Sequence, residues 1–105
     1  MSESGRSERV EIEDLAPGQT CVVEVDSMQV LICNVDGEWF GVENRCSHAR
    51  VPLSEAKLFG CELECPVHGA RFDVRTGDVL CRPARRALRV FPLTRIAGGV
   101  LISLD

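Results

Sequence analysis

The sequence contains few aromatic residues and no long hydrophobic segment. Aromatic side chains account for 5% of its 105 residues, and tyrosine is absent. Nucleic-acid-binding domains usually present a basic surface, whereas this chain has a net charge of −4. No apolar run approaches the roughly 18 residues of a membrane-spanning helix. We therefore expect neither a nucleic-acid partner nor a membrane location.

The first nine residues are polar and lack the apolar core of a signal peptide. We expect a cytoplasmic protein with a flexible N-terminus at residues 1–9 and one folded domain at residues 10–105. The six cysteines could form disulfides in a secreted protein, but without a signal peptide reduced thiols are favoured. We expect four of them to be core thiols: Cys21, Cys33, Cys61 and Cys81.

Short strand-like segments separated by turn residues make up most of the chain. Thr20–Val25 is rich in β-branched residues, Met28–Val35 is a continuous apolar run, and Asp36-Gly37 predicts a tight hairpin before Glu38–Glu43. Further segments of this kind occupy residues 10–12, 61–64, 71–74, 79–80, 88–96 and 100–104. No segment of ten or more residues has a convincing helical pattern. The sequence predicts an all-β antiparallel sandwich or barrel, with Trp39 and the phenylalanines in its core or covering its loops.

The only two histidines in the chain each follow a cysteine closely. The two runs are Cys46-Ser-His48 and Cys65-Pro-Val-His68. Each run offers one thiolate and one imidazole, and a short loop can direct both at a common point. Gly69 follows the second histidine and gives the backbone the freedom to fold closely around a cofactor. We predict that these two cysteines and two histidines are metal ligands.

Two Cys–His pairs are compatible with more than one kind of chemistry. Zn²⁺ binds Cys2His2 sets, but zinc modules usually contain a pair of cysteines and a separate pair of histidines. A [2Fe–2S] cluster with unlike irons takes two cysteines on one iron and two histidines on the other, which suits two mixed loops. A catalytic Cys–His pair is not expected, because no oxyanion motif accompanies either run. The pattern favours the iron–sulfur cluster, with a zinc-stabilised interaction module as an alternative.

The two runs resemble the cluster-binding boxes of Rieske-type [2Fe–2S] ferredoxins. The second box reads Cys65-Pro-Val-His-Gly-Ala-Arg-Phe-Asp-Val-Arg-Thr-Gly77, and the resemblance extends from about residue 10 to the C-terminus. It implies an antiparallel β-sandwich with a small cluster-binding subdomain at one tip, at about residues 44–84. It also implies one cluster per chain, with Cys46 and Cys65 on the inner iron and His48 and His68 on the outer iron.

This resemblance implies electron transfer and no catalysis by the chain itself. The ferredoxins in question are components of bacterial aromatic-ring-hydroxylating dioxygenase systems. Such a carrier, expected to be a monomer, passes single electrons from a flavin-dependent NAD(P)H reductase to a terminal Rieske non-haem iron oxygenase. The sequence lacks a dinucleotide fingerprint, so it does not bind NADH or flavin by that means. An accessory Rieske subunit of a nitrite-reductase-like enzyme is the alternative function.

Four positions differ from the respiratory-chain branch of the same family. Val51 and Val67 stand where that branch has a pair of disulfide-bonded cysteines. Ala70 and Phe72 replace a serine and a tyrosine whose hydroxyl groups donate hydrogen bonds to sulfur. Fewer donors leave the more negative reduced cluster less stabilised. We therefore predict a reduction potential at the low end of the Rieske range, on the order of −150 mV.

Charge is unevenly distributed along the chain. Residues 1–43 carry a net charge of −8 and residues 44–105 a net charge of +4. Such a distribution reflects either local ion pairs on a solvated surface or a field that orients the protein as it approaches a partner. Arg45, Arg50 and Arg71 border the two boxes, and each is expected either to steer docking or to form a structural ion pair.

Overall fold

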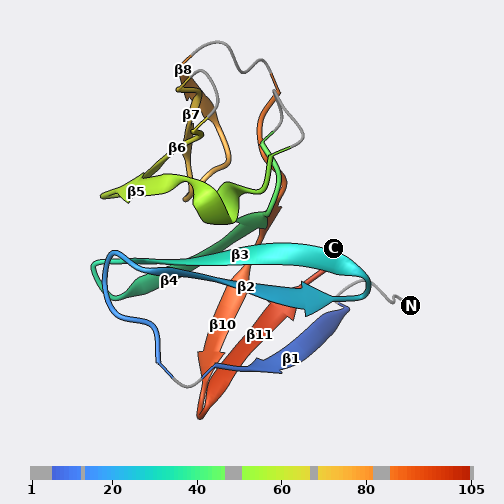
Figure 1. The fold of residues 1–105 in the computed structure, drawn as a ribbon. Coiled ribbons are helices and arrows are strands. Elements are labelled where there is room, and N and C mark those ends of the chain that lie inside the picture. Colours follow the sequence, from blue (N-terminus) through green and yellow to red (C-terminus); the bar gives the residue numbers. More distant parts are fainter. Residues whose placement is uncertain (1–5, 13, 47–50, 67–68, 82–85, 105) are drawn as a thin grey trace.

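The computed structural model describes residues 6–12, 14–46, 51–66, 69–81 and 86–104. Within these ranges the chain forms eleven strands in three antiparallel sheets and one short 3-10 helix. Two sheets form the larger base, and a smaller sheet lies above them (Figure 1). The predicted all-β antiparallel sandwich with a smaller subdomain at one tip is confirmed. The one helix has three residues, so no helix in these ranges can cross a membrane.

Each of the three sheets is formed by its own set of strands. The first has the order β1 (Ser7–Glu11), β11 (Gly99–Ser103) and β10 (Leu93–Ile96). The second has the order β2 (Thr20–Val25), β3 (Met28–Val35), β4 (Glu38–Glu43) and β9 (Val90–Phe91). The upper sheet has the order β5 (Lys57–Phe59), β6 (Glu62–Glu64), β7 (Arg71–Asp73) and β8 (Val79–Cys81). The helix η1 (Leu53–Glu55) leads into the upper sheet.

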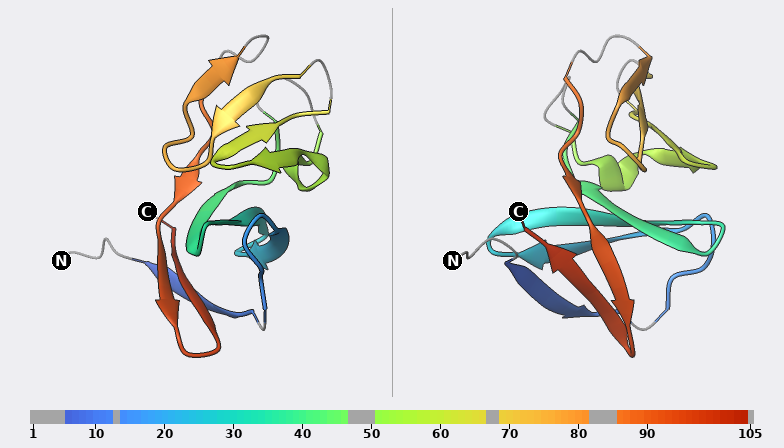
Figure 2. Two further views of the ribbon diagram at one scale, coloured as in Figure 1. Left: turned by 90° about the vertical axis from the view of Figure 1, so that its left-hand side faces the viewer. Right: turned by 180° about the vertical axis from the view of Figure 1, so that it is seen from behind.

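Strand β3 is apolar on both faces because its sheet lies between two layers. Ile32 packs downward into the core of the base, which includes Ile102 of β11. Leu31 packs on the other face, in a second core that includes Phe72 of the upper sheet. The side views show the β2–β3–β4 sheet between the other two (Figure 2). Successive side chains of a strand point to opposite faces, so a strand covered on both sides has a continuous apolar run.

Tight turns fix the register of the β2–β3–β4 meander. Asp36 (φ 53°) and Gly37 (φ 96°) both have left-handed backbone conformations, which is the hairpin geometry predicted for this pair. The backbone amide of Gly37 donates to Oδ1 of Asn34 at 2.7 Å. Val35 therefore pairs with Glu38. The bounds predicted for all three strands of the meander are confirmed.

The first strand begins earlier than predicted. Residues 10–12 were expected to form this strand after a flexible N-terminus at 1–9, but β1 starts at Ser7 and ends at Glu11. Its register pairs Ser7 with Ser103 of β11. Backbone pairing does not require apolar side chains, and most side chains of this edge strand are exposed. Hydrophobic periodicity therefore could not detect its polar beginning.

The segment at residues 88–96 was predicted as a single strand, and this prediction is wrong. It is divided at Pro92 into β9, which pairs with β4, and β10, which pairs with β11. Proline has no N–H group and cannot donate within a ladder. The chain changes sheets at this residue, so that one alternating segment contributes to both layers of the base.

The aromatic residues are only partly core residues. Phe72 and Phe91 are buried, and Phe40 and Trp39 are partly buried against the two cores. Phe59 is 53% exposed at the end of the edge strand β5, so the prediction that it lies in the core or covers a loop is not supported. Arg95 stacks on the exposed side of Trp39, with its guanidinium carbon 3.9 Å from the ring centroid.

The predicted core thiols differ in burial. Cys33 on the central strand β3 is fully buried, as predicted. Cys21 lies on the edge strand β2 and is partly buried, as is Cys61, which follows the turn at Gly60. The side chain of Cys81 lies outside the part of the chain that the structure describes. An edge strand and a turn offer fewer covering neighbours than a central strand, which explains the difference.

Candidate iron–sulfur centre

The two predicted cysteine ligands occupy equivalent positions in the fold. Cys46 follows the end of β4, and Cys65 directly follows β6. The structure assigns neither of them to a disulfide, and they are 2% and 0% exposed. They belong to the same apolar core, between the base and the upper sheet. His48 and His68 lie outside the described residues, so their role as ligands stays a prediction.

Matching hydrogen bonds close the two loops. The amide of Cys46 donates to the carbonyl oxygen of Val51 at 2.9 Å, and the amide of Cys65 donates to that of Ala70 at 2.7 Å. Each bond joins a cysteine to the residue five positions later, across the segment that contains the histidine. Because these two amides are used for loop closure, hydrogen bonds to the sulfurs of a cluster must come from other donors in the loops.

Gly69 has the backbone conformation that its place in the second loop requires. Its φ of +73° lies in the left-handed region, which glycine adopts without steric cost. A Cβ atom at this position would lie 3.5 Å from Oε2 of Glu64, at the start of the same loop. The prediction that glycine allows close folding here agrees with this geometry.

The residues that lack hydroxyl groups belong to the same core as the cysteines. Ala70 and Phe72 are fully buried in the same core as Cys46 and Cys65. Val51 is partly buried and packs against this core, while Val67 lies outside the described residues. The inner side of the loops is thus covered by apolar atoms.

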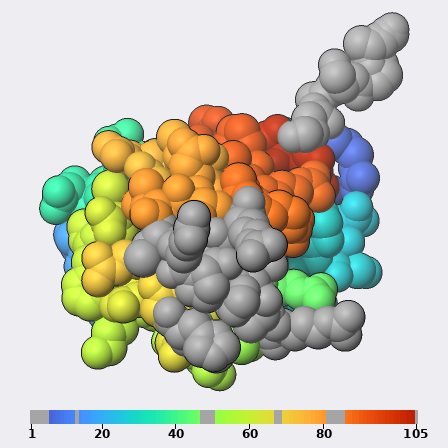
Figure 3. Space-filling model, turned by 90° about the horizontal axis from the view of Figure 1, so that it is seen from above, coloured from blue at the N-terminus to red at the C-terminus, as the bar shows by residue number. Residues whose placement is uncertain are grey.

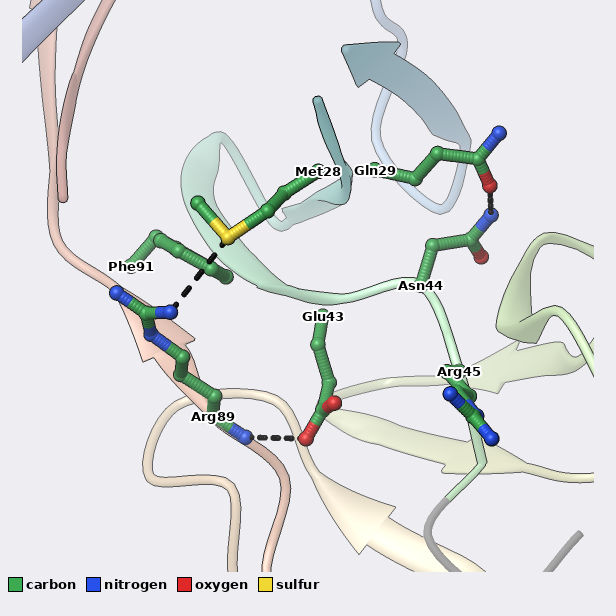
Figure 4. Close-up of a pocket in the computed structure, with 7 residues that line it drawn as sticks. All are labelled: Met28, Gln29, Glu43, Asn44, Arg45, Arg89 and Phe91. Carbon is green, nitrogen blue, oxygen red and sulfur yellow. Dashed lines mark hydrogen bonds between the residues drawn. The ribbon is translucent and has the colours of Figure 1, made fainter. Parts of the chain in front are cut away.

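Charges near the loops include paired and exposed arginines. Arg71 lies 3.8 Å from a carboxylate oxygen of Glu62 and 3.8 Å from one of Glu64, so it forms two partly exposed ion pairs. Arg45 is exposed and faces a surface hollow of about 320 Å³ (Figure 4). Arg50 lies outside the described residues. Arg71 thus has two ion-pair partners and Arg45 is exposed, while a docking role for either arginine stays a prediction.

A bidentate ion pair stabilises the turn after β7. Nη2 and Nε of Arg75 lie 2.9 and 3.1 Å from the two carboxylate oxygens of Asp73. The hydrogen bonds from Arg75 hold the pKa of the Asp73 carboxyl below its usual value. The backbone of Asp73 also donates to Asp78 and accepts from Gly77, which closes the turn between β7 and β8. The second box is thereby attached to an ordered hairpin.

The described residues fit a cluster in their donor chemistry. Two buried cysteine side chains lie in one apolar core, and each stands at the start of a loop that is closed by a hydrogen bond to the residue five positions later. Thiolates are the ligands of iron in such clusters, and surrounding apolar atoms limit water access. Sequence reasoning missed Asn44, a buried side chain that joins the two ends of the first loop. Its partners are 15 and 10 residues away, so no local pattern indicates it.

Comparison with known proteins gives the same picture. Residues 7–92 match the family described as the Rieske [2Fe–2S] domain. The chain is 35% identical over 98 residues to the ferredoxin component of the naphthalene 1,2-dioxygenase system of Pseudomonas putida, covering 93% of this chain and 94% of the relative. It is 41% identical over 92 residues to the biphenyl 2,3-dioxygenase ferredoxin component of Rhodococcus jostii, covering 88% and 86%.

Solved structures share the fold over most of its length. The ferredoxin of carbazole 1,9a-dioxygenase from Nocardioides aromaticivorans superposes with a TM-score of 0.85 at 27% identity, covering 92% of this chain and 98% of that one. A ferredoxin in complex with the oxygenase of carbazole 1,9a-dioxygenase gives a TM-score of 0.85 at 30% identity, covering 92% of each chain. With its paired cysteine loops, its sandwich base and this match over residues 7–92, the chain belongs to the Rieske [2Fe–2S] domain family.

Proposed function

We propose that this chain is the ferredoxin of a multicomponent aromatic-ring dioxygenase system. In this role it accepts single electrons from a flavin-dependent NAD(P)H reductase and passes them to a terminal oxygenase. The observation that carries the proposal is the similarity, over nearly the whole chain, to proteins named as ferredoxin components of such systems. The solved complex of a related ferredoxin with its oxygenase supports the oxygenase as partner.

The residues of the two loops divide the work of holding a cluster. Bound there, a [2Fe–2S] cluster supplies a one-electron couple. The thiolates of Cys46 and Cys65 would hold the inner iron, since both are buried and start the two loops. The imidazoles of His48 and His68 would hold the outer iron. The chain thus contributes ligands, apolar cover and loop geometry, and it acts as an electron-transfer component, not as an enzyme.

The alternatives are less well supported. Membership of a [2Fe–2S] family rejects the zinc-stabilised module. The relatives reported above are ferredoxin components, which supports a separate carrier over an accessory subunit of a nitrite-reductase-like enzyme. We further propose a monomer in the cytoplasm, where NAD(P)H-dependent reductases work.

Reconstitution tests the proposed function. The purified chain is mixed with the reductase and oxygenase of a naphthalene or biphenyl dioxygenase system, NAD(P)H and the aromatic substrate. We expect the visible absorption of the protein to bleach when the reductase is added, and dihydroxylated product to form only when all three proteins are present. Product formation that does not depend on this chain would contradict the proposal.

Serine variants test the ligand assignment separately. Cys46→Ser and Cys65→Ser should lose the red-brown colour and the bound iron, because each removes one thiolate. Cys33→Ser is the matched control, since Cys33 is equally buried in the same core but lies on β3. A coloured Cys65→Ser protein with its full iron content would contradict the assignment.

A further inference from the structure

We propose that Asn44 is a positioning residue that holds the first ligand loop in the geometry that the cluster requires. The inference rests on the proposed ligand role of Cys46, two residues further along the chain. It concerns how firmly the site retains its cluster, and it does not depend on which redox partners the protein serves.

Asn44 connects three segments through one buried side chain. The residue follows β4 and is 8% exposed. Its Nδ2 donates to Oε1 of Gln29 at 3.0 Å, and its Oδ1 accepts from the backbone amide of Ser54 at 2.7 Å. Its own amide donates to the carbonyl oxygen of Gln29 at 3.1 Å. Figure 4 shows the two side-chain amides facing each other at the edge of the surface hollow.

The contact with Ser54 closes the first loop at its base. Asn44 and Ser54 lie on either side of the segment that contains Cys46 and its predicted histidine partner. Inside this closure lies the second bond, from the Cys46 amide to Val51. The outer bond thus fixes the two ends of the loop, and the inner bond fixes the position of the cysteine within it. The second loop has a backbone closure from Cys65 to Ala70, and an ion pair between Glu64 and Arg71 joins its two ends.

The geometry of η1 explains why Ser54 needs an acceptor from another segment. The first amides of a helix have no partner within it. The capping residue, Pro52, provides no side-chain hydrogen bond to this helix. The carboxamide of Asn44 supplies the acceptor instead, while the buried side chain of Leu53 anchors the same turn in the core. The end of the loop is held both by packing and by this hydrogen bond.

Only a carboxamide makes both side-chain contacts as they stand. Alanine at position 44 makes neither, and it leaves the amide of Ser54 without its acceptor. Aspartate keeps the acceptor for Ser54, and Gln29 can turn its own amide to donate to the new carboxylate. Residues that hold the ligands of a metal site typically contribute about 10- to 100-fold to metal affinity. Loss of the Ser54 contact is therefore expected to weaken cluster retention.

A second buried asparagine provides a matched control. Asn34 is 4% exposed, its Nδ2 donates to the carbonyl oxygen of Leu15 at 2.6 Å, and its Oδ1 accepts from the amide of Gly37 at 2.7 Å. It therefore makes the same number of side-chain hydrogen bonds as Asn44. Asn34 stands near the end of β3, at the turn into β4, whereas Gln29, the partner of Asn44, stands near the start of the strand. Asn34→Ala thus reproduces the loss of stability without touching the site.

The experiment compares cluster loss in the loaded proteins. Asn44→Ala, Asn34→Ala and Asn44→Asp are purified with their clusters, and the decay of visible absorption is followed in an iron chelator. We expect Asn44→Ala to lose its cluster about tenfold faster than the unmodified protein. Asn34→Ala and Asn44→Asp should decay at close to the unmodified rate. The electron paramagnetic resonance spectrum of the reduced protein should change in Asn44→Ala and stay unchanged in Asn34→Ala.

Hydrogen–deuterium exchange locates the effect in the chain. Asn44→Ala should exchange faster at the Ser54 amide, and Asn44→Asp should retain protection there. The proposal is overturned if Asn44→Ala keeps its cluster as long as the unmodified protein, or if Asn34→Ala shortens retention equally. If Asn44→Ala cannot be purified with a cluster, the Asn44→Asp protein provides the test. Rapid loss of its cluster while the Ser54 amide is still protected from exchange would overturn the proposal. No reductase or oxygenase enters these assays, so failure of the proposed function would be seen separately.

Discussion

Substitution of Ala70 by serine tests how much a single hydroxyl group changes the reduction potential of the cluster. Its side chain is fully buried in the core that contains both cysteines. In Ala70→Ser, a hydroxyl that donates to sulfur stabilises the more negative reduced state by about 1 kcal/mol. For a one-electron couple this raises the potential by about 40 mV. Voltammetry of both proteins measures the shift, and the unmodified protein should lie on the order of −150 mV.

The conservative variant Ala70→Gly separates the hydroxyl from the change in volume. It removes a methyl group and adds no donor, so it should not raise the potential. An unmodified protein with a potential above zero would contradict the argument from missing donors.

The buried thiol of Cys33 makes the free energy of unfolding depend on pH in the alkaline range. Burial, followed by its proximity to Cys21, raises the pKa of the Cys33 thiol from 9.0 to about 12. A thiol whose pKa is higher in the folded state stabilises that state fully below pH 9.0, and this contribution is lost as the pH rises toward 12. The free energy of unfolding should fall by about 1.4 kcal/mol per pH unit across this window. Urea denaturation at several pH values measures it.

The comparison protein is Cys33→Ala, which has no thiol to titrate. Its stability should decline less steeply between pH 9.0 and 12, although its core has a small cavity. Equal slopes in the two proteins would show that the decline has another source.

The site was predictable from the sequence only where its signal is local. Cys46 and Cys65 were identified because each stands two or three residues from a histidine, and the structure buries both in one core. Asn44 gives no such signal, because its role depends on Gln29 and Ser54, which the fold brings together. The ion pairs of Arg71 likewise depend on the pairing of β6 with β7.

At the scale of secondary-structure elements, Gly77 holds the β7–β8 turn against the segment that leads to β9. Its φ is +81°, and a Cβ atom here would collide with the carbonyl oxygen of Leu88. The amide of Leu88 also donates to the carbonyl oxygen of Gly77 at 2.8 Å. Gly77→Ala combines left-handed strain with a clash against backbone, so it should lower the free energy of unfolding by about 3 kcal/mol.

Gly98 is the matched control for this substitution. Its φ of +77° is nearly the same, but a Cβ atom there would have no neighbour within 4 Å. Gly98→Ala should therefore lower the stability by about 1 kcal/mol, the strain alone. Urea denaturation of both variants tests the difference, and equal losses would show that the contact with Leu88 yields at little cost.

Strand prediction succeeded where neighbouring strands follow one another in the chain. The bounds of β2, β3 and β4 came from local turns and from apolar runs, and tertiary contacts did not alter them. The break at Pro92 was missed because hydrophobic alternation continues through it, while the two halves pair with different strands. Such a change of partner depends on the arrangement of the sheets, which periodicity does not record.

At the scale of the whole molecule, the uneven charge of the sequence is not divided simply between base and tip. The strongly acidic residues 1–43 form β1 to β4 of the base, whereas residues 44–105, with a net positive charge, include β9, β10 and β11 of the base as well as the whole upper sheet. Seen from above, residues of the upper sheet lie beside the segment that returns to the base (Figure 3). The sequence revealed this asymmetry, and the fold distributes its positive part over both the base and the upper sheet.

Salt dependence of electron transfer tests whether this asymmetry orients the protein. Arg45→Gln removes an exposed charge beside the first loop, whereas Arg71→Gln removes one that Glu62 and Glu64 already balance. At about 0.01 M salt, screening acts only beyond about 30 Å, so Arg45→Gln should slow transfer to the oxygenase up to about fivefold. Arg71→Gln should have a smaller effect. Stopped-flow rates should converge at about 1 M salt, and rates independent of salt would mean that docking does not use this field.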